Sequence, residues 1–373
     1  MSSLVNKSTL LGQGGSQVIT KEQVFEALKA VEDPEIRRPV TELDMVKDID
    51  IQDGHVRVVI ALTVKGCPLQ QHFHQEVRRV VGQLEGVTSV EVDLTVMSDQ
   101  ERAQLVEKLR GSNTQQAQSP ILAGTADTEV IAIASGKGGV GKSTVTVNLA
   151  VALAARGYQV GIIDSDMYGS SIPQMMGIDR LPVRIDRVIM PVEKHGVKVI
   201  SMGFFVPENK PVIWRGPMLG KALQQFFNDV HWGDLDFLLL DLPPGTGDIA
   251  LDVHRLLPAA KEIIVTTPQS TATHVAYRAG KMAIDTGHKI IGVVENMSYF
   301  RSAVSQQKEY VFGQGGGSQL AEILEVPLLG QIPLGNPTEE DADIYLKDTE
   351  AWKVFQAIAD AVIEQADRIK VYK

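Results

Sequence analysis

The sequence predicts an α/β protein in which a doubly wound, mostly parallel sheet is preceded by a small α+β domain. Three observations lead to this fold class. From residue 128 onward, segments typical of strands alternate with segments typical of helices, the order that builds a parallel sheet. Several of these strands are apolar throughout, such as FLLL at 237–240, as expected when helices cover both faces of the sheet. A glycine-rich loop joins the first of these strands to a helix.

The composition sets the class of protein. The 373 residues leave room for more than one domain. The net charge of −10 argues against nucleic acid or an anionic membrane as a general partner. A single cysteine, Cys67, excludes an internal disulfide and suits a reducing compartment. No signal peptide and no apolar run of membrane-spanning length is found. We therefore expect a cytoplasmic protein without a membrane partner.

The first domain is predicted over residues 18–110. Thr20 resembles a helix cap, and the apolar residues that follow it are spaced for one buried helix face. A strand at 56–62, a helix at 70–84, a strand at 90–96 and a helix at 99–109 complete the order α-β-α-β-α. This is enough for one small α+β domain.

A linker and a larger domain follow. Residues 111–127 are rich in Gln, Ser, Gly and Pro and have no sustained apolar period, so we interpret them as a linker. The second domain is predicted over 128–373. Its expected strands are 130–134, 159–164, 197–202, 236–241, 262–267, 289–295 and 328–332. The chain closes with a packing helix, indicated by apolar residues at helical spacing from Trp352 onward.

The sequence GKGGVGKST at 136–144 satisfies the phosphate-loop pattern G-x-x-x-x-G-K-[ST]. It lies between the strand at 130–134 and a helical pattern at 145–155, which is the context this pattern requires. Its glycines let successive N–H groups face an anion, and the helix adds its positive end. Lys142 would reach the outer phosphates and Ser143 would bind Mg²⁺. The predicted nucleotide-phosphate site comprises Gly136, Lys137, Gly138, Gly139, Val140, Gly141, Lys142, Ser143 and Thr144.

Carboxylates follow two other predicted strands. Asp241 is the last residue of an apolar strand, and the segment LPPGTGD follows it. At the end of this strand Asp241 would hold the magnesium ion through a bound water. Asp164 and Asp166 come directly after the strand at 160–163. One of them, Asp166 in preference to Asp164, would orient the water that attacks the γ-phosphate. The alternative is that these two residues only cap a loop.

The phosphate loop resembles the deviant class that includes MinD, ParA and the nitrogenase iron protein, because Lys137 is a second lysine within it. The resemblance implies a P-loop NTPase domain that forms an ATP-bound homodimer. In such a dimer Lys137 would touch the nucleotide of the partner and take part in catalysis. The alternative is a solvent-facing lysine.

A closer resemblance is to the Mrp/ApbC family of iron–sulfur cluster carrier ATPases. It is carried by DSDMYGSSIP at 164–173, WRGPM at 214–218, TTPQ at 266–269, GVVENMS at 292–298 and FGQGGG at 312–317. By position, the resemblance implies that Asn296 faces the adenine base and that Pro333 lies in the loop beside it. The front domain resembles the small MIP18-like domain of iron–sulfur assembly proteins, through DPE at 33–35, ELDMV at 42–46 and LTVKGCP at 62–68. Cys67 is the characteristic cysteine of that motif.

The chain departs from this family at one site. Family members hold a cluster through a C-x-x-C pair downstream of the ENMS motif, but residues 298–310 contain neither cysteine nor histidine. Iron–sulfur clusters require thiolate ligands. An iron–sulfur cluster would then need Cys67 from two protomers together with external ligands.

The resemblance implies an ATP-binding and ATP-hydrolysing homodimeric switch that transfers iron–sulfur clusters to apoproteins or assists their maturation. Its partners would be apoprotein clients or assembly factors. The alternative is a regulatory protein that binds a protein or DNA partner when ATP is bound and carries no cluster.

Overall fold

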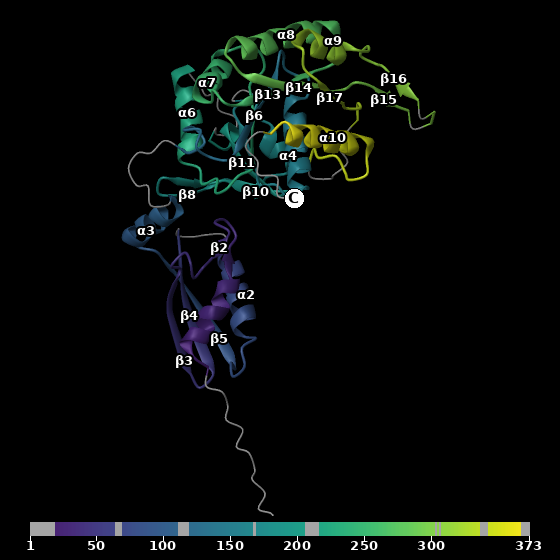
Figure 1. Cartoon of the computed structure of the whole chain (residues 1–373). Helices are drawn as coiled ribbons and strands as arrows, with labels where there is room; N and C mark the ends of the chain where they lie inside the picture. Colours follow the sequence, from purple (N-terminus) through teal and green to yellow (C-terminus); the bar gives the residue numbers. More distant parts are fainter. Residues whose placement is uncertain are drawn as a thin grey trace, which may run out of the picture. The chain divides into compact units, whose positions relative to one another are not determined.

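The computed structural model describes residues 19–63, 69–110, 119–166, 169–205, 216–302, 304–305, 307–335 and 342–366. The chain divides into two compact units, Met1–Ser112 and Asn113–Lys373 (Figure 1). Among the helices that are described, none is long and apolar enough to span a membrane.

The first unit contains a three-stranded sheet in the order β3-β4-β5. Strand β3 is antiparallel to β4, and β5 is parallel to β4. The elements of the unit are α1 (Lys21–Ala27), η1 (Leu28–Ala30), β1 (Glu32–Asp33), β2 (Arg38–Pro39), β3 (Val46–Gln52), β4 (His55–Leu62), α2 (Gln70–Val81), β5 (Ser89–Val96) and α3 (Asp99–Arg110). Thr20 and Gln23 form a capping box at the start of α1, which confirms the predicted cap. Strand β3 was not predicted.

The second unit is built on an eight-stranded sheet, in the order β10-β11-β7-β12-β6-β13-β14-β17. All neighbouring strands in it are parallel except β10 and β11, which confirms the predicted fold class. The strands are β6 (Glu129–Ser135), β7 (Val160–Asp164), β10 (Val192–Lys194), β11 (Val197–Ser201), β12 (Phe237–Asp241), β13 (Lys261–Thr266), β14 (Lys289–Glu295) and β17 (Leu328–Gln331). Two short hairpins lie outside this sheet: β8 (Val183–Ile185) with β9 (Val188–Met190), and β15 (Phe300–Arg301) with β16 (Lys308–Glu309).

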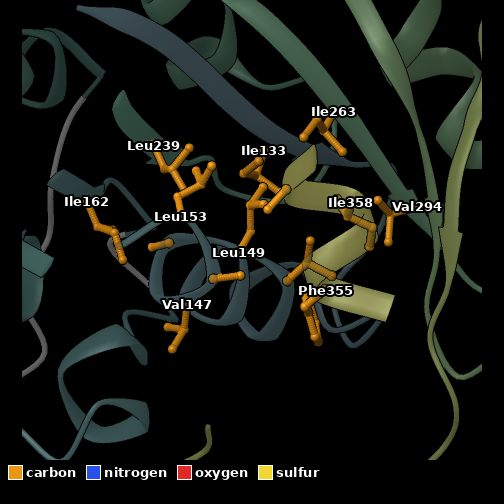
Figure 2. Packing of buried hydrophobic residues seen from close by; sticks show 14 of the residues in the cluster. Ile133, Val147, Leu149, Leu153, Ile162, Leu239, Ile263, Val294, Phe355 and Ile358 are labelled. Atoms are coloured by element: carbon orange, nitrogen blue, oxygen red, sulfur yellow. The ribbon is translucent and has the colours of Figure 1, made fainter. Parts of the chain in front are cut away.

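Helices cover both faces of this sheet (Figure 1). They are α4 (Lys142–Ala154), α5 (Ile172–Met175), α6 (Gly216–Asn228), α7 (Asp248–Leu256), α8 (Ser270–Asp285), α9 (Gly316–Leu324) and α10 (Glu350–Glu364), with the 3-10 turn η2 (Met202–Phe205). On one face, α4 and α10 pack on inward-facing strand residues such as Ile133 and Leu239 (Figure 2). On the other face, α6, α7, α8 and α9 pack on the alternate residues of the same strands. This double cover explains why the central strands are apolar throughout.

The region between the predicted domains is partly packed. The backbone N–H of Ser119 donates to Asn228 Oδ1 at 2.9 Å, and Ile121 and Leu122 pack against the apolar core of the second unit. The second half of the predicted linker therefore lies on the larger unit.

Candidate nucleotide-binding site

The phosphate loop runs from the carboxyl end of β6 to the start of α4, and the surrounding chain fixes it closely. A Cβ atom at Gly136 would lie 2.3 Å from the backbone of α8 at Ala276. Gly141 has a φ of +81° and a Cβ there would lie 2.0 Å from Asn296 Nδ2. A side chain at either position would displace a neighbour, so packing requires glycine at both, and at Gly141 the backbone conformation favours it as well. The middle of the loop, Gly138 and Gly139, is exposed to solvent.

Asp241 is the centre of the polar contacts below this loop. Its Oδ2 atom accepts from Lys142 Nζ at 2.5 Å and from Ser143 Oγ at 2.7 Å. Its Oδ1 atom accepts from Thr146 Oγ1 at 2.6 Å. Lys142 and Asp241 are both buried, so the pair compensates two charges that would be costly to bury alone. The structure thus brings together the three residues predicted to bind phosphate and magnesium, and adds Thr146, which the sequence did not single out.

The same residues fit the groups that a nucleotide would bring. Ser143 and Asp241 supply the hard oxygen ligands that Mg²⁺ prefers. Lys142 supplies an ammonium group at the start of α4, where the helix end also favours an anion. Ser143 and Thr144 are only partly buried, so the start of the helix is open to solvent. The donor set and the accessible glycine loop fit a magnesium-bound phosphate chain.

Asp164 lies beside Asp241 in the sheet, because the two residues are paired in the register of β7 and β12. It accepts from Ser201 Oγ at 2.8 Å and from the backbone N–H of Asp166 at 3.2 Å. Burial, and next the charge of Asp241, raise the pKa of Asp164 to about 7, against the lowering effect of Ser201 and Lys142. Asp164 is therefore poised to exchange a proton near neutral pH.

Asp166 is also buried, and its Oδ1 atom accepts from the backbone N–H of Gly169 at 3.1 Å. Asp166 thus caps the turn that follows β7. This contact agrees with the structural alternative for Asp166 and leaves its catalytic role a prediction.

Two further contacts of the loop involve residues that follow β13 and β14. Lys137 Nζ lies 3.5 Å from Gln269 Oε1, at the start of α8. Asn296 follows β14, is 5% exposed, and donates from Nδ2 to the carbonyl oxygen of Val140 at 3.0 Å. Pro333 is partly buried and follows Ile332, whose carbonyl oxygen accepts from the N–H of Ser298 at 2.8 Å. Sequence reasoning named Asn296 but not its contact with the loop.

Comparison with known proteins shows the family to which the chain belongs. The sequence model of the NUBPL iron-transfer P-loop NTPase family matches residues 127–363. The chain belongs to this family. A second model, of an iron–sulfur cluster assembly protein domain, matches residues 21–93. The phosphate loop of this NUBPL-type NTPase lies within the residues that the family model matches.

Similar proteins cover most of the chain. The iron–sulfur cluster carrier protein of Mycobacterium leprae is 52% identical over 321 residues, which are 84% of this chain and 83% of that protein. The protein of the same name from Bacillus subtilis is 48% identical over 353 residues, 92% of this chain and 98% of that one. Among solved structures, a nucleotide-binding protein in complex with ADP from Archaeoglobus fulgidus is 35% identical, with a TM-score of 0.49, and covers 62% of this chain and 87% of that one.

Two of the predicted features of this NUBPL-type NTPase concern iron–sulfur chemistry. Cys67 lies outside the described residues. The segment without the C-x-x-C pair contains the β15–β16 hairpin. In this segment Arg301 Nε donates to Glu350 Oε2 at 2.5 Å. Lys308 Nζ lies over the ring of Tyr299, 3.8 Å from its centre.

A group of His254, Glu262 and His288 is the one set of metal-ligand residue types found close together in the described part of the chain. All three are buried. His254 Nε2 already bonds to Glu262, and His288 Nε2 bonds to the carbonyl oxygen of Leu257 at 3.0 Å. The Nδ1 atoms of both histidines lie 3.1 Å from Thr286 Oγ1, so both nitrogens of each ring already have hydrogen-bond partners. The two imidazole rings also stack, with centroids 4.3 Å apart and an interplanar angle of 28°. We interpret the group as a hydrogen-bonded packing cluster.

The raised pKa of Asp164 predicts how stability depends on pH. In the folded protein this carboxyl keeps its proton up to about pH 7, whereas in the unfolded chain it loses the proton near its ordinary value of 3.8. Raising the pH through this window therefore lowers the free energy of unfolding. Asp164→Asn should remove this loss, on the order of a few kcal/mol. Calorimetric melting of the nucleotide-free protein from pH 4.5 to 8 would show a falling Tm in the wild type and a flatter profile in the variant. Parallel profiles would contradict the assignment.

Proposed function

We propose that this protein binds and hydrolyses ATP as a homodimeric switch, and that the switch drives the handling of iron–sulfur clusters for apoprotein clients. The proposal of ATP binding and hydrolysis rests on the contact of Asp241 with Lys142 and Ser143 beside a solvent-exposed glycine loop. The handling of iron–sulfur clusters is supported by the family match and by relatives named as iron–sulfur cluster carrier proteins.

Each residue of the site has a proposed role. The amides from Gly136 to Thr144 and the ammonium group of Lys142 would bind the phosphate chain. Ser143 and, through a water, Asp241 would hold Mg²⁺. The ion would neutralise charge on the phosphates. The buried carboxylates Asp166 or Asp164 would orient the attacking water.

Lys142 must change partners when the nucleotide arrives. In the structure its ammonium group is bound to Asp241, and both groups are buried. When Lys142 turns to phosphate, Asp241 needs another cation, because an unpaired buried carboxylate is strongly unfavourable. A magnesium ion delivered with the nucleotide supplies that charge. We infer that nucleotide and metal bind together.

The proposed functions of the two units differ. We propose a small assembly-type domain over residues 18–110, a linker at 111–127 and an ATPase domain over 128–373. The cluster is cargo in this proposal. Since Cys67 is the one cysteine of the chain, a cluster would be held by Cys67 from two protomers with external thiols as the other ligands. Clients or assembly factors in the cytoplasm would be the partners.

Anaerobic reconstitution with iron, sulfide and a small thiol tests the cargo. We expect visible absorption that corresponds to about one cluster per two chains, because each chain contributes one thiolate. Cys67→Ala should abolish this absorption while nucleotide binding, measured by calorimetry, is retained. Absence of uptake by the wild type would overturn the carrier function.

A second candidate function is favoured by one observation. Residues 298–310, where family carriers have their thiolate pair, contain no cysteine. A switch without cargo would bind a protein or DNA partner in its ATP-bound state. The charge of −10 favours a protein over DNA. Failure of reconstitution together with intact ATP binding would point to this function.

A further inference from the structure

The amide of Asn296 has a fixed orientation toward the phosphate loop. Its nearest polar partner is the carbonyl oxygen of Val140, at 3.0 Å. A carbonyl oxygen only accepts hydrogen bonds, so the NH₂ group of Asn296 must face it and the Oδ1 atom must face the other way. The two functions of one amide are thereby separated: the nitrogen binds the loop, and the oxygen is turned away from Val140.

This contact sets the direction of a loop amide. The peptide group between Val140 and Gly141 is planar and trans. Its carbonyl oxygen and its N–H group therefore point in opposite directions. When Asn296 holds the oxygen, the Gly141 N–H is aimed away from Asn296. The fit leaves little freedom, since even a Cβ at Gly141 would collide with Asn296 Nδ2.

Asn296 is itself held in place by its neighbours. Its backbone N–H donates to the carbonyl oxygen of Thr266 at 2.8 Å. The preceding residue, Glu295, is fully buried, and its carboxylate accepts from Gly317 N at 2.5 Å and from Ser298 Oγ at 2.6 Å. The following residue, Met297, has a φ of +54°, a conformation that costs energy and persists only where the surroundings enforce it. The contacts at the end of β14 thus fix the position of the Asn296 amide.

We propose that Asn296 is a positioning residue that presets the phosphate loop through Val140, independently of the base of the nucleotide. The inference rests on the proposed nucleotide binding but goes beyond it, because it assigns to Asn296 an effect on phosphate affinity. A base-reading role alone would use the amide oxygen and leave the affinity for a base-free phosphate chain unchanged.

The test uses inorganic tripolyphosphate with Mg²⁺, which has no base, beside ADP with Mg²⁺. Calorimetric titrations would compare the wild type with Asn296→Ala and with Asn296→Leu, both of which remove the donor without adding charge, the second while keeping a side chain of similar length. We expect both variants to bind tripolyphosphate about tenfold more weakly, as loss of one buried hydrogen bond implies. The matched control is Thr128→Val, which removes a different buried bond, from Thr128 Oγ1 to the carbonyl oxygen of Leu235 at 2.9 Å. It should bind both ligands like the wild type.

The outcomes are distinct. Unchanged tripolyphosphate affinity in a folded Asn296 variant would overturn the inference, and so would a wild type that binds ADP but not tripolyphosphate. An equal loss in Thr128→Val would show that lower stability alone weakens binding, and would overturn it too. A wild type that binds neither ligand would refute the proposed nucleotide binding itself. Either variant suffices if the other does not fold, as judged by circular dichroism.

Discussion

Lys142→Ala is expected to abolish nucleotide binding at ordinary concentrations and to destabilise the fold at the same time. The variant loses a charge-assisted contact with phosphate, and several such contacts act together at this site, so Kd should rise by about 100-fold or more. It also leaves Asp241, which is fully buried, without its cation. Removing one partner of a buried pair lowers the free energy of unfolding by about 3 kcal/mol or more.

Titration calorimetry with magnesium ADP and thermal melting measure the two effects separately. Lys281→Ala is a suitable control, because it removes a lysine from an exposed ion pair with Asp285 at 2.6 Å. Exposed pairs contribute little to stability, so this variant should match the wild type in both measurements. Unchanged ATPase activity of Lys142→Ala would refute the assignment of the loop.

The parts of the site that lie next to one another along the chain, or at the ends of apolar strands, were predictable. The phosphate loop has a local pattern with a defined geometry. Asp164 and Asp241 end two apolar strands, and parallel strands of one sheet bring their carboxyl ends to one edge. Their pairing in the register of β7 and β12 confirms that expectation.

Other features depend on contacts between distant segments and have no local signal. The bond between Asn296 and Val140 joins residues 156 positions apart. Nothing in either segment specifies that partner. Strand β3 was not predicted for a different reason. Its sequence, VKDIDIQ, carries two acidic residues, which are rare in strands. They are tolerated because this strand lies at the edge of its sheet.

Lys137→Ala is expected to lower ATP turnover by about a thousandfold while changing nucleotide affinity little. Within its own chain the one hydrogen bond of the Lys137 ammonium group among the described residues is to Gln269, at 3.5 Å, and Lys137 is not part of the group around Asp241. A cation supplied by a partner subunit contributes to the transition state rather than to ground-state binding, and the loss of such a cation has effects of this size. Single-turnover hydrolysis and ADP titration would separate the two quantities.

Mixing two inactive variants decides whether Lys137 acts across a dimer. The first variant is Lys137→Ala, and the second is Asp166→Asn, which should lack turnover but keep Lys137. If Asp166→Asn proves active, Asp164→Asn replaces it. In a mixed dimer with Lys137→Ala, one site then has its own carboxylate and receives Lys137 from the partner, while the other site lacks both. Random pairing of equal amounts should restore about a quarter of wild-type activity, because half of the dimers are mixed and each has one complete site. If Lys137 served its own site, no dimer would contain a complete site and the mixture would stay inactive. Restored activity therefore requires that two chains share each nucleotide.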